Sequence, residues 1–252
     1  MTAPVVALTF DDGPSSYRPR TLEILREARV RATFFEVGMR VEANPQLVAF
    51  AVREGHQVLN HTAFHRKLTG LSPAEIRAEV IAAEFALAAA LRATPRSSTT
   101  DPSSGLAMRA PFLAVDDAVR AVLADIGYVT VVDADIRTED SDAATPAEQL
   151  RDEVFDQLHP GGVVVLHDGN IDTPAGRSVV TALPEIIAGV RARGYRFGAL
   201  DERGRVVDAG PLRPCAEPIP PIVKPVPYLP LVSRLRGDPP QDPPSPFTIV
   251  VP

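Results

Sequence analysis

The sequence predicts an α/β fold in which parallel strands form a barrel. From residue 5 to about residue 208, short apolar runs alternate with segments whose apolar residues recur at helical spacing. Polar side chains suited to chemistry stand at the ends of several runs, and parallel α/β barrels gather active-site residues at the carboxyl ends of strands. With 252 residues, 45% of them hydrophobic, the chain can bury one large core.

The alternation of the two patterns gives the order of elements. We expect strands at 5–8, 32–38, 56–60, 106–110, 128–132, 163–167 and 195–200. We expect helices at 19–29, 44–53, 73–92, 115–126, 145–159 and 178–193. Residues 72–75 read Ser-Pro-Ala-Glu, a capping box with proline at the first helical position, and residues 145–148 read Thr-Pro-Ala-Glu. Both predict a helix N-terminus.

Two adjacent carboxylates, Asp11 and Asp12, follow the first expected strand, and Gly13-Pro14 then turns the chain away. Neighbouring strand residues point in different directions, so one carboxylate can bind a metal while the other faces a reacting water. Unpartnered carboxylates this close repel each other, and a divalent cation removes the repulsion. A solvated turn accounts for these residues equally well.

Two histidines, His61 and His65, follow the third expected strand. If their segment is helical, both imidazoles lie on one face, about 5–6 Å apart at Cβ, and can share a metal. Two His and one Asp give a metal three protein ligands and leave a position for water, as in catalytic rather than structural sites. His167-Asp168 ends a further strand in the same way. The alternatives are an incidental histidine pair and a surface histidine in a turn.

Four stretches together resemble the ordered motifs of carbohydrate esterase family 4, the polysaccharide deacetylases: 9–14, 61–65, 109–112 and 166–168. The resemblance covers about residues 5–208. It implies a distorted, incomplete parallel (β/α) barrel forming a catalytic domain over residues 1–210. It also implies a metal-dependent hydrolase that removes acetyl groups from N-acetylated or O-acetylated carbohydrate, that is, from an amino-sugar or polysaccharide substrate.

The same resemblance assigns roles to individual residues. Asp12, His61 and His65 would hold one divalent ion, with Zn²⁺ the first choice and Co²⁺, Mn²⁺ or Ni²⁺ also suited. Asp11 would be the general base that takes a proton from the metal-activated water. His167 would be the general acid that protonates the leaving group.

Five further residues complete the expected site. Arg109 would orient the base and keep it ionised, and Asp135 would hydrogen-bond the acid and favour its protonated form. Pro111, Phe112 and Leu166 would contact substrate. A surface cation at Arg109 and a solvated loop acid at Asp135 are the plainer interpretations.

The chain departs from the family pattern in the substrate pocket. It contains no Trp, and Asp140-Ser141 stands where the family usually has Asp-Trp. Leu113 replaces a Gly, and Val165 replaces a Leu. These changes leave open a carbohydrate-binding pseudoenzyme, and an amidohydrolase acting on a non-sugar amide such as a ureide.

Composition limits the partners. The net charge of −6 predicts no nucleic-acid partner, and no run reaches the roughly 18 apolar residues of a membrane span. The single cysteine, Cys215, excludes an internal disulfide. No signal peptide precedes the first strand, which leaves a cytoplasmic protein or a domain excised from an exported or membrane protein. The oligomeric state is not indicated.

Residues 211–252 hold 14 of the 26 prolines, which predicts a semi-rigid spacer or tail. The strand-like run at 249–251, within the stretch 246–252, resembles the opening strand of family 2 glycosyltransferases. It suggests that a further, glycosyltransferase-like domain begins near Phe247. An edge strand or a disordered tail are the alternatives.

Overall fold

The computed structural model describes residues 3–92, 106–142, 144–168 and 175–224. The strands are β1 (Val5–Gly13), β2 (Thr33–Glu36), β3 (Gln57–Asn60), β4 (Leu106–Met108), β5 (Tyr128–Val131), β6 (Ile136–Arg137), β7 (Val163–His167), β8 (Arg196–Leu200) and β9 (Val206–Val207). The helices are α1 (Arg18–Ala28), α2 (Gly38–Ala43), α3 (Pro45–Glu54), α4 (Pro73–Leu91), α5 (Asp117–Asp125), α6 (Ala147–Asp156) and α7 (Ala175–Ala192), with a short 3₁₀ turn at Pro111–Leu113.

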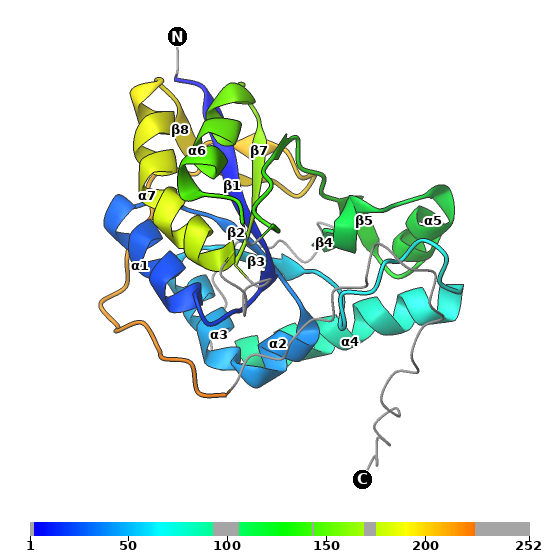
Figure 1. The fold of residues 1–252 in the computed structure, drawn as a ribbon. Coiled ribbons are helices and arrows are strands. Elements are labelled where there is room, and N and C mark those ends of the chain that lie inside the picture. Colours follow the sequence, from blue (N-terminus) through cyan, green and yellow to red (C-terminus); the bar gives the residue numbers. More distant parts are fainter. Residues whose placement is uncertain (1–2, 93–105, 143, 169–174, 225–252) are drawn as a thin grey trace.

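The sheet is parallel and curls into a partial barrel, as the resemblance implied (Figure 1). Its strand order is β5-β4-β3-β2-β1-β7-β6, with β8 pairing in parallel with the first residues of β1 and β9 antiparallel to β8. Among the described residues no pairing joins β5 to β6, so the barrel is open there. Because neighbouring strands are parallel, the carboxyl ends of β1, β2, β3, β4 and β7 meet at one end.

Strand alternation divides the packing around β1 between two of the hydrophobic clusters. Val6, Leu8 and Phe10 of β1 point outward and pack with buried residues of α1, α3, α6 and α7. The opposite face of β1 contributes Ala7 to a smaller cluster inside the barrel, with Phe35 and others. Each buried Leu, Val or Phe side chain contributes about 1.5–3 kcal/mol, so this packing supplies the rigid frame for the strand ends.

Most expected elements are present with their ends shifted by a few residues. The capping box at Ser72 is confirmed: Glu75 N–H donates to Ser72 Oγ (3.3 Å), and Ser72 N–H donates to the Glu75 carboxylate (2.9 Å). The second capping box is wrong. The N-cap of α6 is Pro146, and Thr145 Oγ1 instead donates to the carbonyl of Glu139 (2.9 Å), which fixes the preceding loop.

After β9 the chain runs back along the barrel as an extended segment, residues 211–224, which we call the strap. Cys215 N–H donates to the carboxylate of Glu54 at the end of α3 (2.8 Å). At the start of α3, Asn44 Oδ1 accepts from two strap backbone N–H groups (2.9 and 3.3 Å), and Asn44 Nδ2 donates to Lys224 O (3.1 Å). The strap therefore follows α3 in reverse, without forming a helix or strand.

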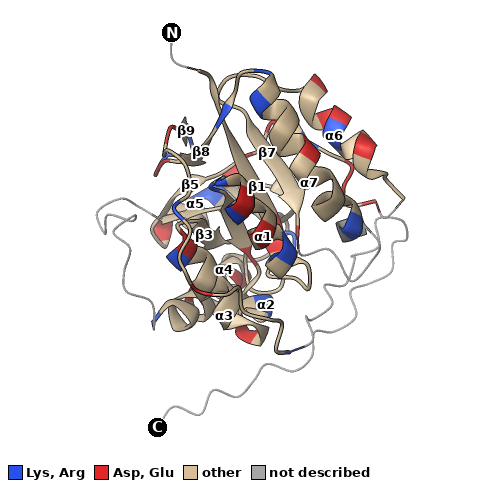
Figure 2. Cartoon of the chain, turned by 90° about the vertical axis from the view of Figure 1, so that its left-hand side faces the viewer, with Lys and Arg blue, Asp and Glu red and all other residues tan. Residues whose placement is uncertain are grey.

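The expected boundary between residues 210 and 211 stays a prediction. Residues 225–252, including the run near Phe247, lie outside the described residues. In the described part of the chain, no helix combines the length and apolar character needed to cross a membrane. Figure 2 shows acidic and basic residues interspersed along the helices, so the elements in that view form no face of a single charge.

Candidate active site

Both carboxylates at the end of β1 lie close to the same histidine, His61. A regular strand would point them to opposite faces. The backbone of Asp12, however, has a φ of 66°, in the left-handed region that few non-glycine residues adopt. As a result, Asp12 Oδ1 lies 3.2 Å and Asp11 Oδ2 3.9 Å from Nε2 of His61. Backbone strain of this kind concentrates at functional sites.

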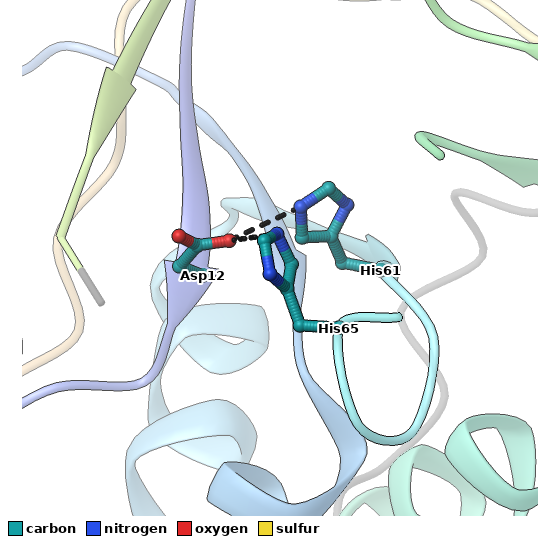
Figure 3. A group of neighbouring side chains, drawn as sticks. All are labelled: Asp12, His61 and His65. Atoms are coloured by element: carbon teal, nitrogen blue, oxygen red, sulfur yellow. Dashed lines mark ion pairs between the residues drawn. The ribbon is translucent and has the colours of Figure 1, made fainter. Parts of the chain in front are cut away.

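Asp12, His61 and His65 form a compact cluster of metal-ligand type. One ligand atom from each lies within 4.8 Å of the others, and Figure 3 shows the Asp12 carboxylate facing both rings. Asp12 Oδ1 is 3.0 Å from His65 Nε2, yet it is buried and has no well-aligned hydrogen bond. A buried oxygen in this position requires compensation. A divalent cation shared with the two imidazoles would provide it, so the residues present fit the expected metal.

The pKa values of Asp12 and His61 agree with a metal site here. Burial alone would raise the pKa of Asp12, but the adjacent imidazoles, His65 first, hold it well below its usual value. Burial alone would lower the pKa of His61, but Asp11 and Asp12 raise it above its usual value. Negative charge on Asp11 and Asp12 thus favours positive charge at this position, as a cation site requires.

The loop carrying the two histidines is not helical. The two imidazoles therefore do not come together on one face of a helix, which was the arrangement considered from the sequence. Thr62 and His65 have positive φ values of 68° and 56°, and the chain passes from β3 through an irregular turn. The two rings still meet, with centroids 5.1 Å apart. His61 Nδ1 donates to the carbonyl of Arg109 (2.8 Å), which leaves Nε2 free to face the Asp12 carboxylate.

Arg109 reaches Asp11 as expected. Its Nη1 lies 2.6 Å from Asp11 Oδ1 and also donates to Thr9 Oγ1 (2.8 Å). The guanidinium is fully buried and stacks 4.1 Å from the centre of the Phe35 ring. Because the stack and the bonds fix its plane, the guanidinium can fix the orientation of the Asp11 carboxylate in turn.

His167 pairs with Asp140 rather than with Asp135. Asp140 Oδ1 lies 2.8 Å from His167 Nδ1, and Asp140 Oδ2 accepts the backbone N–H of His167 (2.6 Å). Burial alone would lower the pKa of His167, but the Asp140 carboxylate, assisted by Asp12 and Asp11, raises it to about 10. His167 is therefore protonated at neutral pH.

The expected contact between Asp135 and His167 is wrong. Asp135 accepts the backbone N–H of Val163 (2.7 Å) at the opposite end of β7 and pairs with the exposed His159 (3.2 Å). Strand β6 intervenes and carries the chain along β7 before Asp140 is reached. The available sequence signal was the position of Asp140, where the family pattern has its Asp-Trp pair.

The three expected substrate contacts differ in exposure. Phe112 is 46% exposed, and its ring centroid lies 4.8 Å from that of His65. Pro111 is buried, and its part in binding stays a prediction. The expectation that Leu166 contacts substrate is wrong, because its side chain is fully buried in the outer core. Alternation along β7 puts Val165 in the inner cluster and Leu166 on the other face.

An open α/β barrel with an Asp-His-His cluster, a buried Asp-Arg pair and an Asp-paired histidine at one end of its strands is the arrangement of a metal-dependent hydrolase. Residues 1–131 match the family model for polysaccharide deacetylase. The chain therefore belongs to the polysaccharide deacetylase family.

Its relatives share most of its length. It is 36% identical over 202 residues to a chitooligosaccharide deacetylase from Bradyrhizobium sp., covering 79% of this chain and 85% of the relative. It is 32% identical over 200 residues to a peptidoglycan-N-acetylglucosamine deacetylase from Bacillus cereus, covering 79% and 87%. The solved family 4 carbohydrate esterase from Streptomyces lividans in complex with acetate superposes with a TM-score of 0.70 at 28% identity, covering 83% of this chain and 100% of that one. The chain is accordingly a metal-dependent carbohydrate deacetylase, which acts on amide bonds.

Proposed function

We propose that this chain removes the acetyl group from N-acetylglucosamine units of an oligosaccharide or polysaccharide. The observation that carries the proposal is the convergence of the Asp12-His61-His65 cluster with Asp11 and His167 at one end of the barrel. The relatives named above act on chitooligosaccharide and on peptidoglycan, which supports an N-acetylated amino sugar as substrate.

Zn²⁺ is the proposed metal. One carboxylate and two imidazole nitrogens, with positions left for water and substrate, suit zinc best, and Co²⁺, Mn²⁺ and Ni²⁺ accept the same donors. When bound, such an ion polarises the acetamide carbonyl and lowers the pKa of its water from 15.7 to roughly 7.

The protein's own residues would carry the proton transfers. Asp11, oriented by Arg109, takes a proton from the water that adds to the carbonyl carbon. As the carbon–nitrogen bond breaks, His167 donates its proton to the leaving nitrogen, and acetate and a free amine result. Asp140 keeps His167 charged for this step. Phe112, exposed beside His65, offers an apolar surface for the sugar ring.

The test is acetate release by the zinc-loaded protein from chitooligosaccharides, peptidoglycan, small N-acetyl sugars and O-acetylated xylan. We expect release from the N-acetylated glycans, and losses of about 10²–10⁴-fold for His167→Ala. Glycan binding without release by the zinc-loaded protein would instead identify the pseudoenzyme. Hydrolysis of ureides alone would identify the non-sugar amidohydrolase. No structural observation favours either alternative.

A further inference from the structure

Three buried arginines surround the carboxyl end of β1, and one of them has no part in the chemistry proposed so far. Arg109 holds the Asp11 carboxylate, and Arg40 Nη1 donates to the backbone carbonyl of Asp12 (3.1 Å). Arg18, the first residue of α1, contacts neither carboxylate. It is nevertheless completely buried.

Arg18 joins two buried acids. Its Nη1 donates to Glu36 Oε1 (2.6 Å), and its Nη2 donates to Asp168 Oδ1 (3.0 Å), while Nε also bonds the Asp168 carboxylate. The guanidinium lies 3.9 Å from the centre of the Phe34 ring. All three charged side chains are inaccessible to solvent. Burying such a group costs several kcal/mol per ion, so stability alone is a weak reason for having it.

Each acid of this cluster is connected to the candidate active site through the backbone. The carbonyl of Glu36, at the end of β2, accepts the N–H of His61 (2.9 Å). The N–H of Asp168, the residue after His167, donates to the carbonyl of Asp11 (3.2 Å). The cluster therefore ties together the strand ends that carry the proposed base, one metal ligand and the proposed acid.

The guanidinium also occupies the space beside Gly13. A Cβ at position 13 would lie 2.0 Å from Arg18 Nη2, 2.5 Å from Glu36 Oε2 and 2.6 Å from Asp168 Oδ1. Any other residue at position 13 would displace these three side-chain ends, and the residue before it is Asp12 with its left-handed backbone. Arg18 thus packs directly against the turn that aims the Asp12 carboxylate at the two histidines.

We propose that Arg18 is a positioning residue for the metal site. By bridging Glu36 and Asp168 it fixes the turn at Gly13, and through that turn it sets the aim of the Asp12 carboxylate. It touches neither the metal position nor the reacting atoms. The part of this inference that concerns turnover rests on the proposed function, whereas the part that concerns metal affinity does not.

The variant Arg18→Lys keeps the charge but cannot bridge two carboxylates with one planar fork. Arg26→Lys is the matched control, because Arg26 lies on the same helix, pairs with the buried Glu54 (2.9 Å) and contacts no residue of the candidate active site. Zinc affinity is measured by chelator competition, alongside kcat and KM for acetate release. For Arg18→Lys we expect zinc affinity and kcat to fall roughly 10- to 100-fold with KM little changed, as for residues that orient metal ligands.

Arg26→Lys should retain the parent's zinc affinity and kcat, even where its thermal unfolding temperature falls. If Arg18→Lys does not fold, Asp168→Asn decides, since it removes one charge of the cluster and keeps both its size and the backbone N–H to Asp11. The proposal would be overturned if the folded variant, Arg18→Lys or Asp168→Asn, bound zinc as tightly as Arg26→Lys does. Absence of acetate release by the parent would count against the proposed function only, because the ranking of zinc affinities would still stand.

Discussion

Replacing Asp140 with Asn should shift the pH dependence of catalysis. The Asp140 carboxylate makes the largest contribution to raising the pKa of His167 from 6.5 to about 10. A rise of this size corresponds to roughly 5 kcal/mol in favour of the protonated imidazole. Asn keeps the size of the side chain and removes the negative charge. A hydrogen bond to a charged group contributes about 1.5–3 kcal/mol, or roughly 1–2 pH units. A quarter of the His167 side chain is exposed, so solvent screening favours the lower end.

The sign follows from the role of His167 as an acid. Activity requires the protonated imidazole, so it is present below the pKa and lost as pH rises through it. In Asp140→Asn the alkaline limb of the kcat/KM profile for acetate release should therefore move down by about 1–2 pH units. A cation on Asp12 offsets part of the carboxylate field, so the limb of the zinc-loaded parent should lie below 10.

Asp135→Asn is the control, because Asp135 pairs with the exposed His159 at the other end of β7. Its profile should superimpose on that of the parent. An alkaline limb that stays in place in Asp140→Asn, or that moves equally in Asp135→Asn, would refute the assignment of His167 and Asp140.

Three other predictions concern metal, base and stability. Asp12→Ala, His61→Ala and His65→Ala should each lower bound zinc and abolish acetate release while circular dichroism stays native-like; full zinc content in any of them would contradict its ligand role. Asp11→Asn should keep its zinc and lose about 10²–10⁴-fold in kcat. Burial lowers the pKa of His56 to about 3, so His56 is neutral in the folded protein. Below pH 6.5 only the unfolded chain takes up this proton, so the free energy of unfolding should fall by about 1.4 kcal/mol per pH unit. Urea denaturation at pH 6.5 and 5 should show a shallower loss for His56→Gln.

The order of strands and helices could be predicted because long periodic segments bury one face. Helix α2 was missed, since Gly38–Ala43 is only six residues long and too short to show a period. Residue types also sufficed to find the metal cluster, because Asp and His side chains at successive strand ends add little to a core and together make a typical ligand set.

What could not be predicted depends on contacts between distant segments. The left-handed backbone of Asp12 occurs where Arg40 donates to its carbonyl, and that of Thr62 where its carbonyl accepts the N–H of Gly38 (3.0 Å). Such contacts have no local signature. Asp135 and Asp140 are likewise both acids after β5. Apart from the family position of Asp140, only the path of β6 decides which one meets His167.

The strap has a consequence for how this domain can be linked to other molecules. Asn44, the C-cap of α2, donates a hydrogen bond to the carbonyl of Lys224 in the strap. At the other end of α2, Gly38 N–H donates to the carbonyl of Thr62 in the histidine loop (3.0 Å). Asp208, by contrast, pairs with Arg196 at the amino end of β8. A cargo fused after Lys224 would therefore start at the catalytic end of the barrel, and one fused at Asp208 at the far end. The attachment point sets the distance that a linker must span, and so, together with linker length, the local concentration of a tethered glycan at the active site.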